Sequence, residues 1–332
     1  MREPSFWWRE PGWQSALLAP FATGYGAIAA RRMDRRGTRA PVPVFCVGNF
    51  TLGGSGKTPT AIAIAQILRE AGERPFCLSR GYGGTNAGPV RVDPDRQRAA
   101  EVGDEALLLA RIVPTIVSRD RIAGARAAHD AGASVIVMDD GLQNSLIAKD
   151  LTIVTVDGRR GIGNACVFPA GPLRAPLSAQ FAHADALLVV GDGDGASPVA
   201  ALTQARGLPV LRGALTPEPT AAAALSQRKV LAFAGIGDPE KFFATLESAG
   251  IDAPVRRGFA DHHRFSGAEA ARLLKQAEKN GLDLLTTEKD LARIAGEPDL
   301  AALAARARAL PVTLTMRDSD ALRRLVLAKI GK

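Results

Sequence analysis

The chain has 332 residues, a formal net charge of +8, three cysteines, and hydrophobic side chains at 46% of its positions. This length exceeds what one hydrophobic core usually accommodates, so we expect two domains, and the apolar content is ample for packing both. The cysteines are scattered and lack C-x-x-C spacing, which argues against a zinc module and fits a reducing compartment.

The N-terminal segment, residues 1–36, is predicted to associate with a membrane. Residues 13–30 carry no charge, tryptophans stand at the start of this run, and seven arginines lie within residues 1–39. A proline and two glycines interrupt the run, which at 18 residues is short for a bilayer span. Aromatic residues at one end and arginines at the other are typical of a segment lying among lipid headgroups. An ordinary helix packed on the domain, with solvated arginines, is the alternative.

A glycine-rich motif organises the chain at residues 47–59, V-G-N-F-T-L-G-G-S-G-K-T-P. Apolar runs on both sides predict the order strand, glycine loop, helix. Glycines let successive backbone N–H groups point at an anion, and the helix adds its positive dipole end. Lys57 can reach the β- and γ-phosphates, and the Thr58 hydroxyl can ligate Mg²⁺. We expect a nucleoside triphosphate to bind at Thr51, Leu52, Gly53, Gly54, Ser55, Gly56, Lys57 and Thr58.

This motif departs at one position from the usual G-x-x-x-x-G-K-[ST], because Thr51 stands where the first glycine belongs. The alternative is a glycine-rich turn that happens to end in Lys-Thr, which the flanking strand and helix patterns disfavour. Nucleotide binding by itself does not say what happens to the γ-phosphate.

A second motif, S-V-I-V-M-D-D-G, occupies residues 134–141. A buried hydrophobic strand that ends in two carboxylates is the Walker-B arrangement, which places negative charge where Mg²⁺ is needed. Asp139 and Asp140 are therefore predicted to hold the metal close to Thr58. The alternative is a plain turn after a strand.

Strands and helices alternate along the chain, which predicts an α/β fold with a doubly wound, mostly parallel sheet of the P-loop NTPase kind. We assign this core domain to residues 37–222. A composition shift at residues 216–228 reads as a linker, and a βα pattern resumes at residue 229 without a second phosphate loop. Residues 223–332, including the closing strand and helix, are predicted to form a smaller α/β domain.

Two candidate acid–base groups stand on different domains. Asp104 opens a helix of the core domain, and His262 lies in the cluster at residues 261–263. A hydroxyl that accepts a phosphoryl group needs a positioned proton acceptor, and a histidine from a second domain could orient Asp104 for that task. The alternatives are an aspartate that complements the helix dipole and a loop of solvated histidines.

Arginines follow two other predicted elements. Arg80 comes directly after a strand, in a loop expected at the same sheet edge as the glycine motif, and Arg174 lies in a proline-rich loop. Each is a candidate contact for phosphate or an acidic substrate group. A capping or solvated arginine is the alternative in both cases.

Together these motifs resemble the tetraacyldisaccharide 4'-kinase family, the lipid A 4'-kinases of Gram-negative bacteria. The residues that carry the resemblance follow the family's order over nearly the whole chain: the 47–59 motif, S-R-G-Y-G (79–83), G-D-E (103–105), D-D-G-L-Q (139–143), F-P-A-G-P-L-R (168–174), D-H-H (261–263) and T-E-K-D (287–290).

The resemblance implies transfer of the γ-phosphoryl group of ATP to the 4'-hydroxyl of a tetraacylated glucosamine disaccharide 1-phosphate, giving lipid IVA in lipid A biosynthesis. Lys57 and Thr58 would serve ATP and Mg²⁺, and the two aspartates of the second motif would surround the metal. Asp104 would act as the base, tuned by His262. Arg80 and Arg174 would contact phosphates or substrate.

The resemblance also implies a place for the enzyme: the cytoplasmic face of the inner membrane, as a peripheral or monotopic protein without an obligate protein partner. Three positions depart from the family pattern, which has Phe, His and Glu where this chain has Leu142, Asn144 and Ala175.

Two functions of other classes compete with the kinase. One is a soluble P-loop ATPase of the partitioning or metallochaperone type, whose loop also favours G-G-x-G-K-T. The other is a nucleic-acid-binding protein that uses the basic N-terminus. Aromatic residues among those arginines and the lack of a nucleic-acid motif argue against it, so no nucleic acid is expected as a partner.

Overall fold

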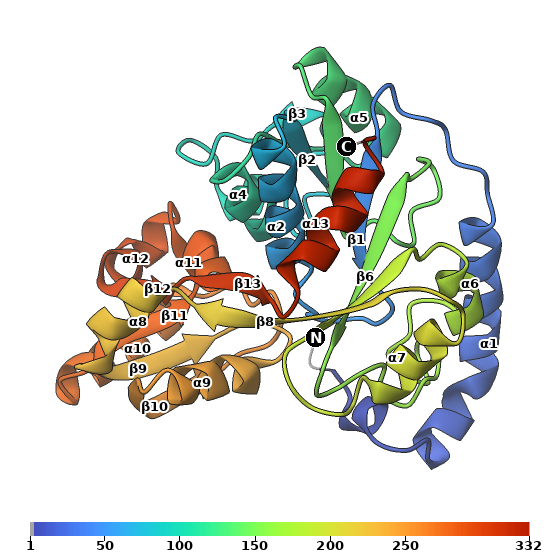
Figure 1. The fold of residues 1–332 in the computed structure, drawn as a ribbon. Coiled ribbons are helices and arrows are strands. Elements are labelled where there is room, and N and C mark those ends of the chain that lie inside the picture. Colours follow the sequence, from blue (N-terminus) through green and yellow to red (C-terminus); the bar gives the residue numbers. More distant parts are fainter. Residues whose placement is uncertain (1–2, 332) are drawn as a thin grey trace.

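In the computed structural model, which describes residues 3–331, a nine-stranded sheet forms the core of the larger of two lobes (Figure 1). Its strand order is β13-β8-β7-β6-β1-β5-β2-β4-β3, and all neighbours are parallel except β8 with β13 and β3 with β4. The strands are β1 (Val44–Asn49), β2 (Pro75–Ser79), β3 (Val90–Arg91), β4 (Thr115–Val117), β5 (Val135–Asp139), β6 (Leu151–Asp157), β7 (Ala186–Val190), β8 (Val210–Pro217) and β13 (Val312–Met316).

Helices cover both faces of this sheet, because its central strands are apolar on both sides. Along β1, Phe45 and Val47 pack in the cluster under α2, while Val44 and Cys46 belong to the opposite cluster, which contains residues of α5. The predicted doubly wound fold is confirmed. The helices of this lobe are η1 (Ser5–Trp8), α1 (Trp13–Met33), α2 (Lys57–Glu70), α3 (Ala99–Val102), α4 (Asp104–Ala110), α5 (Arg121–Asp130), α6 (Leu177–Phe181), α7 (Ser197–Gln204) and α13 (Ser319–Ala328).

The second lobe is built on a parallel four-stranded sheet in the order β10-β9-β11-β12. Its α10 begins with a capping box between Ser266 and Glu269. The elements of this lobe are α8 (Pro219–Ser226), β9 (Lys229–Ala234), α9 (Pro239–Ser248), β10 (Asp252–Gly258), α10 (Gly267–Lys279), β11 (Asp283–Thr287), α11 (Glu288–Ile294), η2 (Pro298–Leu300), α12 (Ala301–Arg306) and β12 (Ala307–Leu310).

The domain boundary differs from the prediction at the C-terminal end. β13 pairs with β8 in the large sheet, and α13 buries Leu322 and Val326 in the same cluster as α2. The second lobe is therefore an insertion, roughly residues 219–310, between two antiparallel strands of the core. The expected linker at residues 216–228 is the end of β8 followed by α8. Residues 1, 2 and 332 of the predicted domains lie outside the described part of the chain.

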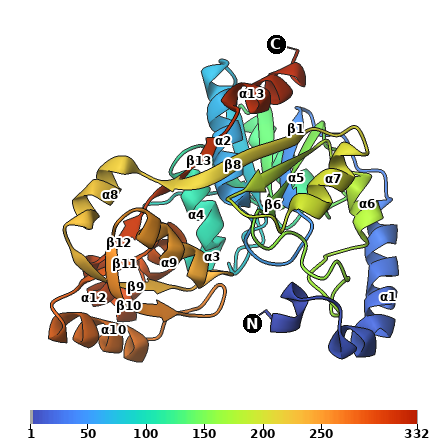
Figure 2. The same ribbon diagram turned by 60° about the horizontal axis from the view of Figure 1, so that its bottom comes forward.

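Helix α1 lies on the far side of the large lobe from the second lobe in both views (Figures 1 and 2). It runs through Pro20 without a break. Within residues 3–331, no helix combines the length and the apolar character that crossing a bilayer requires.

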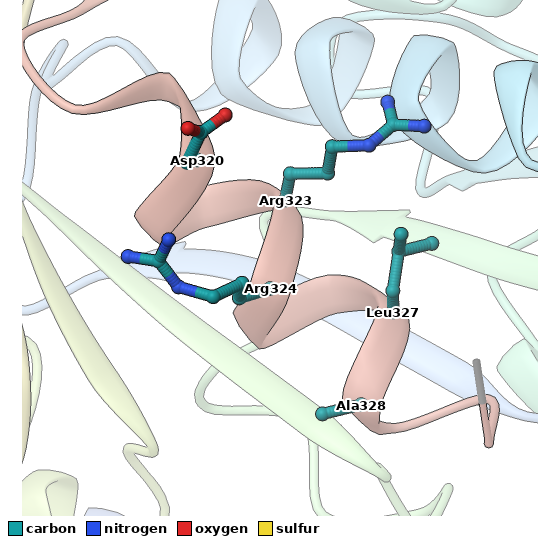
Figure 3. Close-up of a pocket in the computed structure, with 5 residues that line it drawn as sticks. All are labelled: Asp320, Arg323, Arg324, Leu327 and Ala328. Atoms are coloured by element: carbon teal, nitrogen blue, oxygen red, sulfur yellow. The ribbon is translucent and has the colours of Figure 1, made fainter.

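A shallow hollow of about 450 Å³ lies on α13 and is lined by Asp320, Arg323, Arg324, Leu327 and Ala328 (Figure 3). Arg323 also pairs with Glu70 at the last residue of α2, at 2.8 Å. The glycine loop precedes the first residue of α2, so this hollow belongs to the opposite end of the helix from the predicted site.

Candidate functional site

The glycine loop connects β1 to α2, and the helix begins at Lys57. Gly53 and Gly56 have φ of 96° and 84°, a backbone region that residues with a Cβ rarely adopt. The Asn49 side chain donates a hydrogen bond to the Gly53 carbonyl at 3.1 Å, and the Thr60 hydroxyl donates to the Gly56 carbonyl at 2.8 Å. The flanking strand and helix thus hold the loop in a fixed shape, as a preformed anion cradle requires.

Thr51 stands at the position of the usual first glycine because this part of the loop is extended. It forms an isolated β-bridge with Leu173, and the Leu52 N–H donates to the Pro172 carbonyl at 2.8 Å. The proline-rich loop at residues 168–174 therefore braces the start of the glycine loop. Sequence spacing alone gives no sign of this contact.

The expected metal residues lie side by side. The Thr58 hydroxyl donates to Asp139 Oδ2 at 3.0 Å, while Asp139 Oδ1 is buried and has no hydrogen-bond partner. Burial and the nearby Glu105 raise the pKa of Asp139 to about 7, since a lone buried carboxylate is costly to ionise.

This donor set fits Mg²⁺, which is commonly held by one or two carboxylates and a hydroxyl while phosphates and water fill its other positions. The orphaned Asp139 oxygen is what a bound cation would satisfy. The described residues contain no cluster of three or more acidic, histidine or cysteine ligands, so a cage made by protein alone is not what this site offers.

Asp140 links the proline-rich loop to the first residue of α2 at the candidate phosphate site. Its carboxylate pairs with Arg174 Nη1 at 2.7 Å and lies 3.8 Å from Lys57 Nζ. Its φ of 54° is unusual for a residue with a side chain, and such strain is often found at functional sites. Arg174 and Lys57 hold the pKa of Asp140 well below its ordinary value despite burial. Arg174 also donates through Nε to the Thr51 carbonyl at 2.9 Å, so it forms part of the wall of the glycine loop.

Asp104 and His262 meet across the two lobes. His262 Nδ1 lies 3.5 Å from Asp104 Oδ2, and the imidazole ring packs on Tyr82 at 4.8 Å between centroids. Asp104 is almost fully buried, and His262 adopts φ 51°. Burial opposes ionisation of Asp104, but His262, Arg293 and Lys289 outweigh it and hold the pKa of Asp104 well below its usual range.

Arg80 is exposed at the end of β2, the strand next to β5 in the sheet. Near it lies Arg121, a buried arginine that the sequence interpretation did not select. Burial lowers the pKa of Arg121 to about 10, while Asp140 and Asp139 act in the opposite direction. A buried cation close to the metal-site carboxylates is a candidate phosphate contact, but an arginine in a helix start gives no such signal in sequence.

The second lobe contributes cations that sequence reasoning also missed. Lys289 Nζ lies 2.6 Å from the Glu105 carboxylate, and Arg293 lies 2.5 Å from Asp104. Arg264 donates to the Gly83 carbonyl at 2.8 Å. These contacts bring the T-E-K-D motif and the D-H-H motif against the first turn of α4 and the loop after β2. Each partner is remote in sequence, so only the fold shows the pairing.

Other motif residues serve the framework. Gln143 donates to the Asn49 carbonyl at 2.8 Å, and Glu288 accepts from the Val312 N–H at 3.2 Å. Of the three departures from the family pattern, Leu142 and Ala175 are buried in one apolar cluster. The Asn144 side chain accepts from the Leu146 N–H at 3.0 Å, which is a local turn contact.

Known proteins similar to this chain are consistent in their family. The family model for tetraacyldisaccharide-1-P 4'-kinase, LpxK, matches residues 14–331. A relative from Nitrobacter winogradskyi named tetraacyldisaccharide 4'-kinase is 55% identical over 332 residues, covering 100% of this chain and 98% of the relative. A relative of the same name from Rhodopseudomonas palustris (strain BisA53) is 55% identical over 331 residues and is covered to 96%.

A solved structure of LpxK from Aquifex aeolicus in complex with ATP aligns with a TM-score of 0.70 and 26% identity. The alignment covers 95% of this chain and 99% of that one. Because the family model and the full-length relatives agree, this chain belongs to the tetraacyldisaccharide-1-P 4'-kinase family.

Proposed function

We propose that this kinase transfers the γ-phosphoryl group of ATP to the 4'-hydroxyl of a tetraacylated disaccharide 1-phosphate at the junction of its two lobes. The observation that carries the proposal is the meeting of Asp104 and His262, 3.5 Å apart, from lobes that also touch at the glycine loop. An ATPase switch needs no proton acceptor for an alcohol, whereas a kinase does.

The substrate oxygen attacks the γ-phosphorus, and the bond from that phosphorus to the β,γ-bridging oxygen breaks, so ADP leaves with the electron pair. The hydroxyl proton passes to Asp104, whose orientation and charge are set by His262. Phosphoryl transfer asks the protein chiefly to position groups and to stabilise charge, so a buried carboxylate that stays ionised suits this role.

The phosphates are held by the glycine loop, with Lys57 on the β- and γ-phosphates. Arg174 and Arg80 are the proposed contacts for phosphate or substrate anions. When Mg²⁺ is bound, it neutralises charge on the phosphates, and Thr58, Asp139 and Asp140 are the residues that would hold it. Burial lowers the pKa of Lys57, and the Asp140 carboxylate opposes this and favours the charged amine.

Helix α1 is the proposed membrane-docking element. Its solvent side is apolar, with Trp13 74% and Phe21 70% exposed, and arginines follow at its C-terminal end. Exposed large apolar side chains on one helix in a row mark an interaction surface, and the adjacent basic residues favour anionic lipid. The other members of the row are Leu17, Tyr25 and Ile28.

A groove of about 690 Å³ runs between α1 and the 166–176 loop, and its lining is mostly apolar. One side of the groove is α1, which carries the docking face, and the other side is the loop that contains Leu173. Leu173 forms the β-bridge with Thr51 at the start of the glycine loop. The proposal places the substrate's acyl chains along this side, so that the sugar reaches the phosphate site from the surface of the cytoplasmic leaflet.

Incubation of the purified protein with γ-labelled ATP, Mg²⁺ and disaccharide 1-phosphate tests the activity. Label should appear in the lipid phase and be absent with Asp104→Asn. ATP hydrolysis without labelled lipid would favour the soluble ATPase. Flotation with anionic and zwitterionic vesicles tests docking. If the protein floats with neither kind of vesicle, at low or at high salt, the role of α1 is refuted.

A further inference from the structure

Arg293 lies in α11, the helix of the second lobe that packs on α4 of the core. Its side chain is 8% exposed. Its neighbour Ala292 is buried in one apolar cluster with Val102 and Ala106, which lie on either side of Asp104 in the chain. The apolar contact fixes the distance between the two helices, so the guanidinium is delivered to a defined point at the first turn of α4.

The guanidinium of Arg293 joins three groups. Its Nε donates to Asp104 Oδ2 at 2.7 Å, and Nη2 lies 2.5 Å from the same oxygen. Its Nη1 donates to the Gly235 carbonyl at 2.6 Å and to Asp290 Oδ1 at 2.7 Å. A planar fork with several donors can hold such partners at fixed angles, which a lysine ammonium cannot do.

The Gly235–Gly237 loop connects this fork to the phosphate site. The Gly235 N–H donates to Asp290 Oδ2 at 3.0 Å, and the Gly235 carbonyl accepts from Arg293. Both backbone groups of Gly235 are therefore bound by side chains of α11. At the other end of the loop, a Cβ placed on Gly237 would lie 3.2 Å from the Gly54 backbone nitrogen. The loop therefore rests directly on the glycine loop that receives the triphosphate.

We propose that Arg293 is a positioning residue that fixes the Asp104 carboxylate beside His262 when the Gly235–Gly237 loop is seated on the phosphate loop. The inference rests on the proposed role of Asp104 as proton acceptor. The same guanidinium contacts the Gly235 carbonyl and the Asp104 carboxylate. Docking of the second lobe at Gly235 therefore also orients Asp104. Asp104 is then correctly oriented only in the docked arrangement.

The charged and titratable groups around Asp104 are Arg293, Lys289 and Asp290 from α11, His262 from the loop after β10, and Glu105 beside it. Asp104 Oδ1 accepts the Glu105 N–H at 3.0 Å, so Arg293 restrains the second oxygen of a carboxylate already held at the first. Removing the fork leaves that oxygen with the imidazole alone, and the carboxylate gains rotational freedom and a higher pKa.

Three variants test the proposal: Arg293→Met removes the charge, Arg293→Lys keeps it without the fork, and Arg228→Met is a matched control. Arg228 is in the same lobe, is exposed, and pairs at 2.6 Å with Asp283 at the first residue of β11. We expect kcat to fall by about tenfold or more in Arg293→Met and less in Arg293→Lys, with ATP affinity within about twofold. Arg228→Met should match the parent.

Two readouts separate positioning from a general loss of structure. The acid limb of the kcat–pH profile should move to higher pH in Arg293→Met, because activity needs ionised Asp104 and its pKa rises when the cation is removed. In an Asp104→Asn background, Arg293→Met should cause no further loss of kcat.

An unchanged kcat, a loss of kcat with an unmoved acid limb, or an equal further loss in the Asp104→Asn background would each overturn the proposal. Melting temperatures of all variants show whether folding is retained, and Arg293→Lys carries the test if Arg293→Met is unstable. Full activity of Asp104→Asn alone would instead refute the proposed base, whatever Arg293 does.

Discussion

The two lobes meet at one site but contribute to it in different ways. The large sheet supplies backbone and short side chains at fixed strand ends: the glycine loop after β1 and the carboxylates after β5. The second lobe supplies long cationic side chains and an imidazole that reach across to Asp104 and Glu105. In the proposed function, the first kind of contribution binds a phosphate whether or not the lobes meet, and the second exists only when they do.

The sharpest test of this difference is Asp104→Asn, since Asp104 is where the second lobe acts on the core. We expect kcat to fall about a thousandfold, as is typical when a positioned proton acceptor is lost. ATP affinity, measured by calorimetry, should be nearly unchanged because the glycine loop is intact. A large loss of ATP binding would mean that the two contributions are not separable.

Lys57, at the first residue of α2 in the large lobe, should behave in the opposite way. Lys57→Met should lower kcat/KM for ATP by about a hundredfold and weaken nucleotide binding itself, because a buried cation leaves the phosphate site. Titration with a fluorescent ATP analogue gives the affinity directly. Normal binding with slow turnover would assign Lys57 to the transition state alone.

The large sheet also depends on β13 and α13, which follow the second lobe in the chain. Leu322→Ala on α13 should lower the free energy of unfolding by about 3 kcal/mol, roughly 150-fold in the folding equilibrium, because a fully buried leucine leaves a cavity. Urea denaturation measures this change. The control is Leu202→Ala, at a 42% exposed site on α7, which should have a much smaller effect.

The smallest expected effect concerns α1, which carries no residue assigned to the phosphoryl transfer itself. Phe21→Glu should weaken binding to anionic vesicles by about tenfold, since one large apolar side chain is lost from the docking face. Turnover of a detergent-dispersed substrate should stay close to that of the parent. Leu202→Glu, at an exposed apolar site on α7, is the matched control, and equal weakening by both would argue against a specific docking surface.

Sequence reasoning found the elements whose structure depends on local spacing. The glycine loop, the carboxylates after β5, the doubly wound sheet and the family follow from patterns a few residues long. It failed where partners are far apart in the chain: Arg293 on Asp104, Lys289 on Glu105, and Leu173 beside Thr51. The return of α13 to the large sheet was missed for the same reason, since a strand and helix after a linker look the same whichever sheet they join.

The place of β13 and α13 after the inserted second lobe has a consequence for biosynthesis. The ribosome makes the glycine loop before the second lobe, yet the helix that packs on α2 is made only after that lobe. Until residues 312–328 are made, the apolar cluster around α2 lacks Leu322 and Val326, and the edge strand β8 lacks its antiparallel neighbour. A nascent chain stalled before residue 312 should therefore expose this cluster to chaperones, although it already carries every residue assigned to the chemistry.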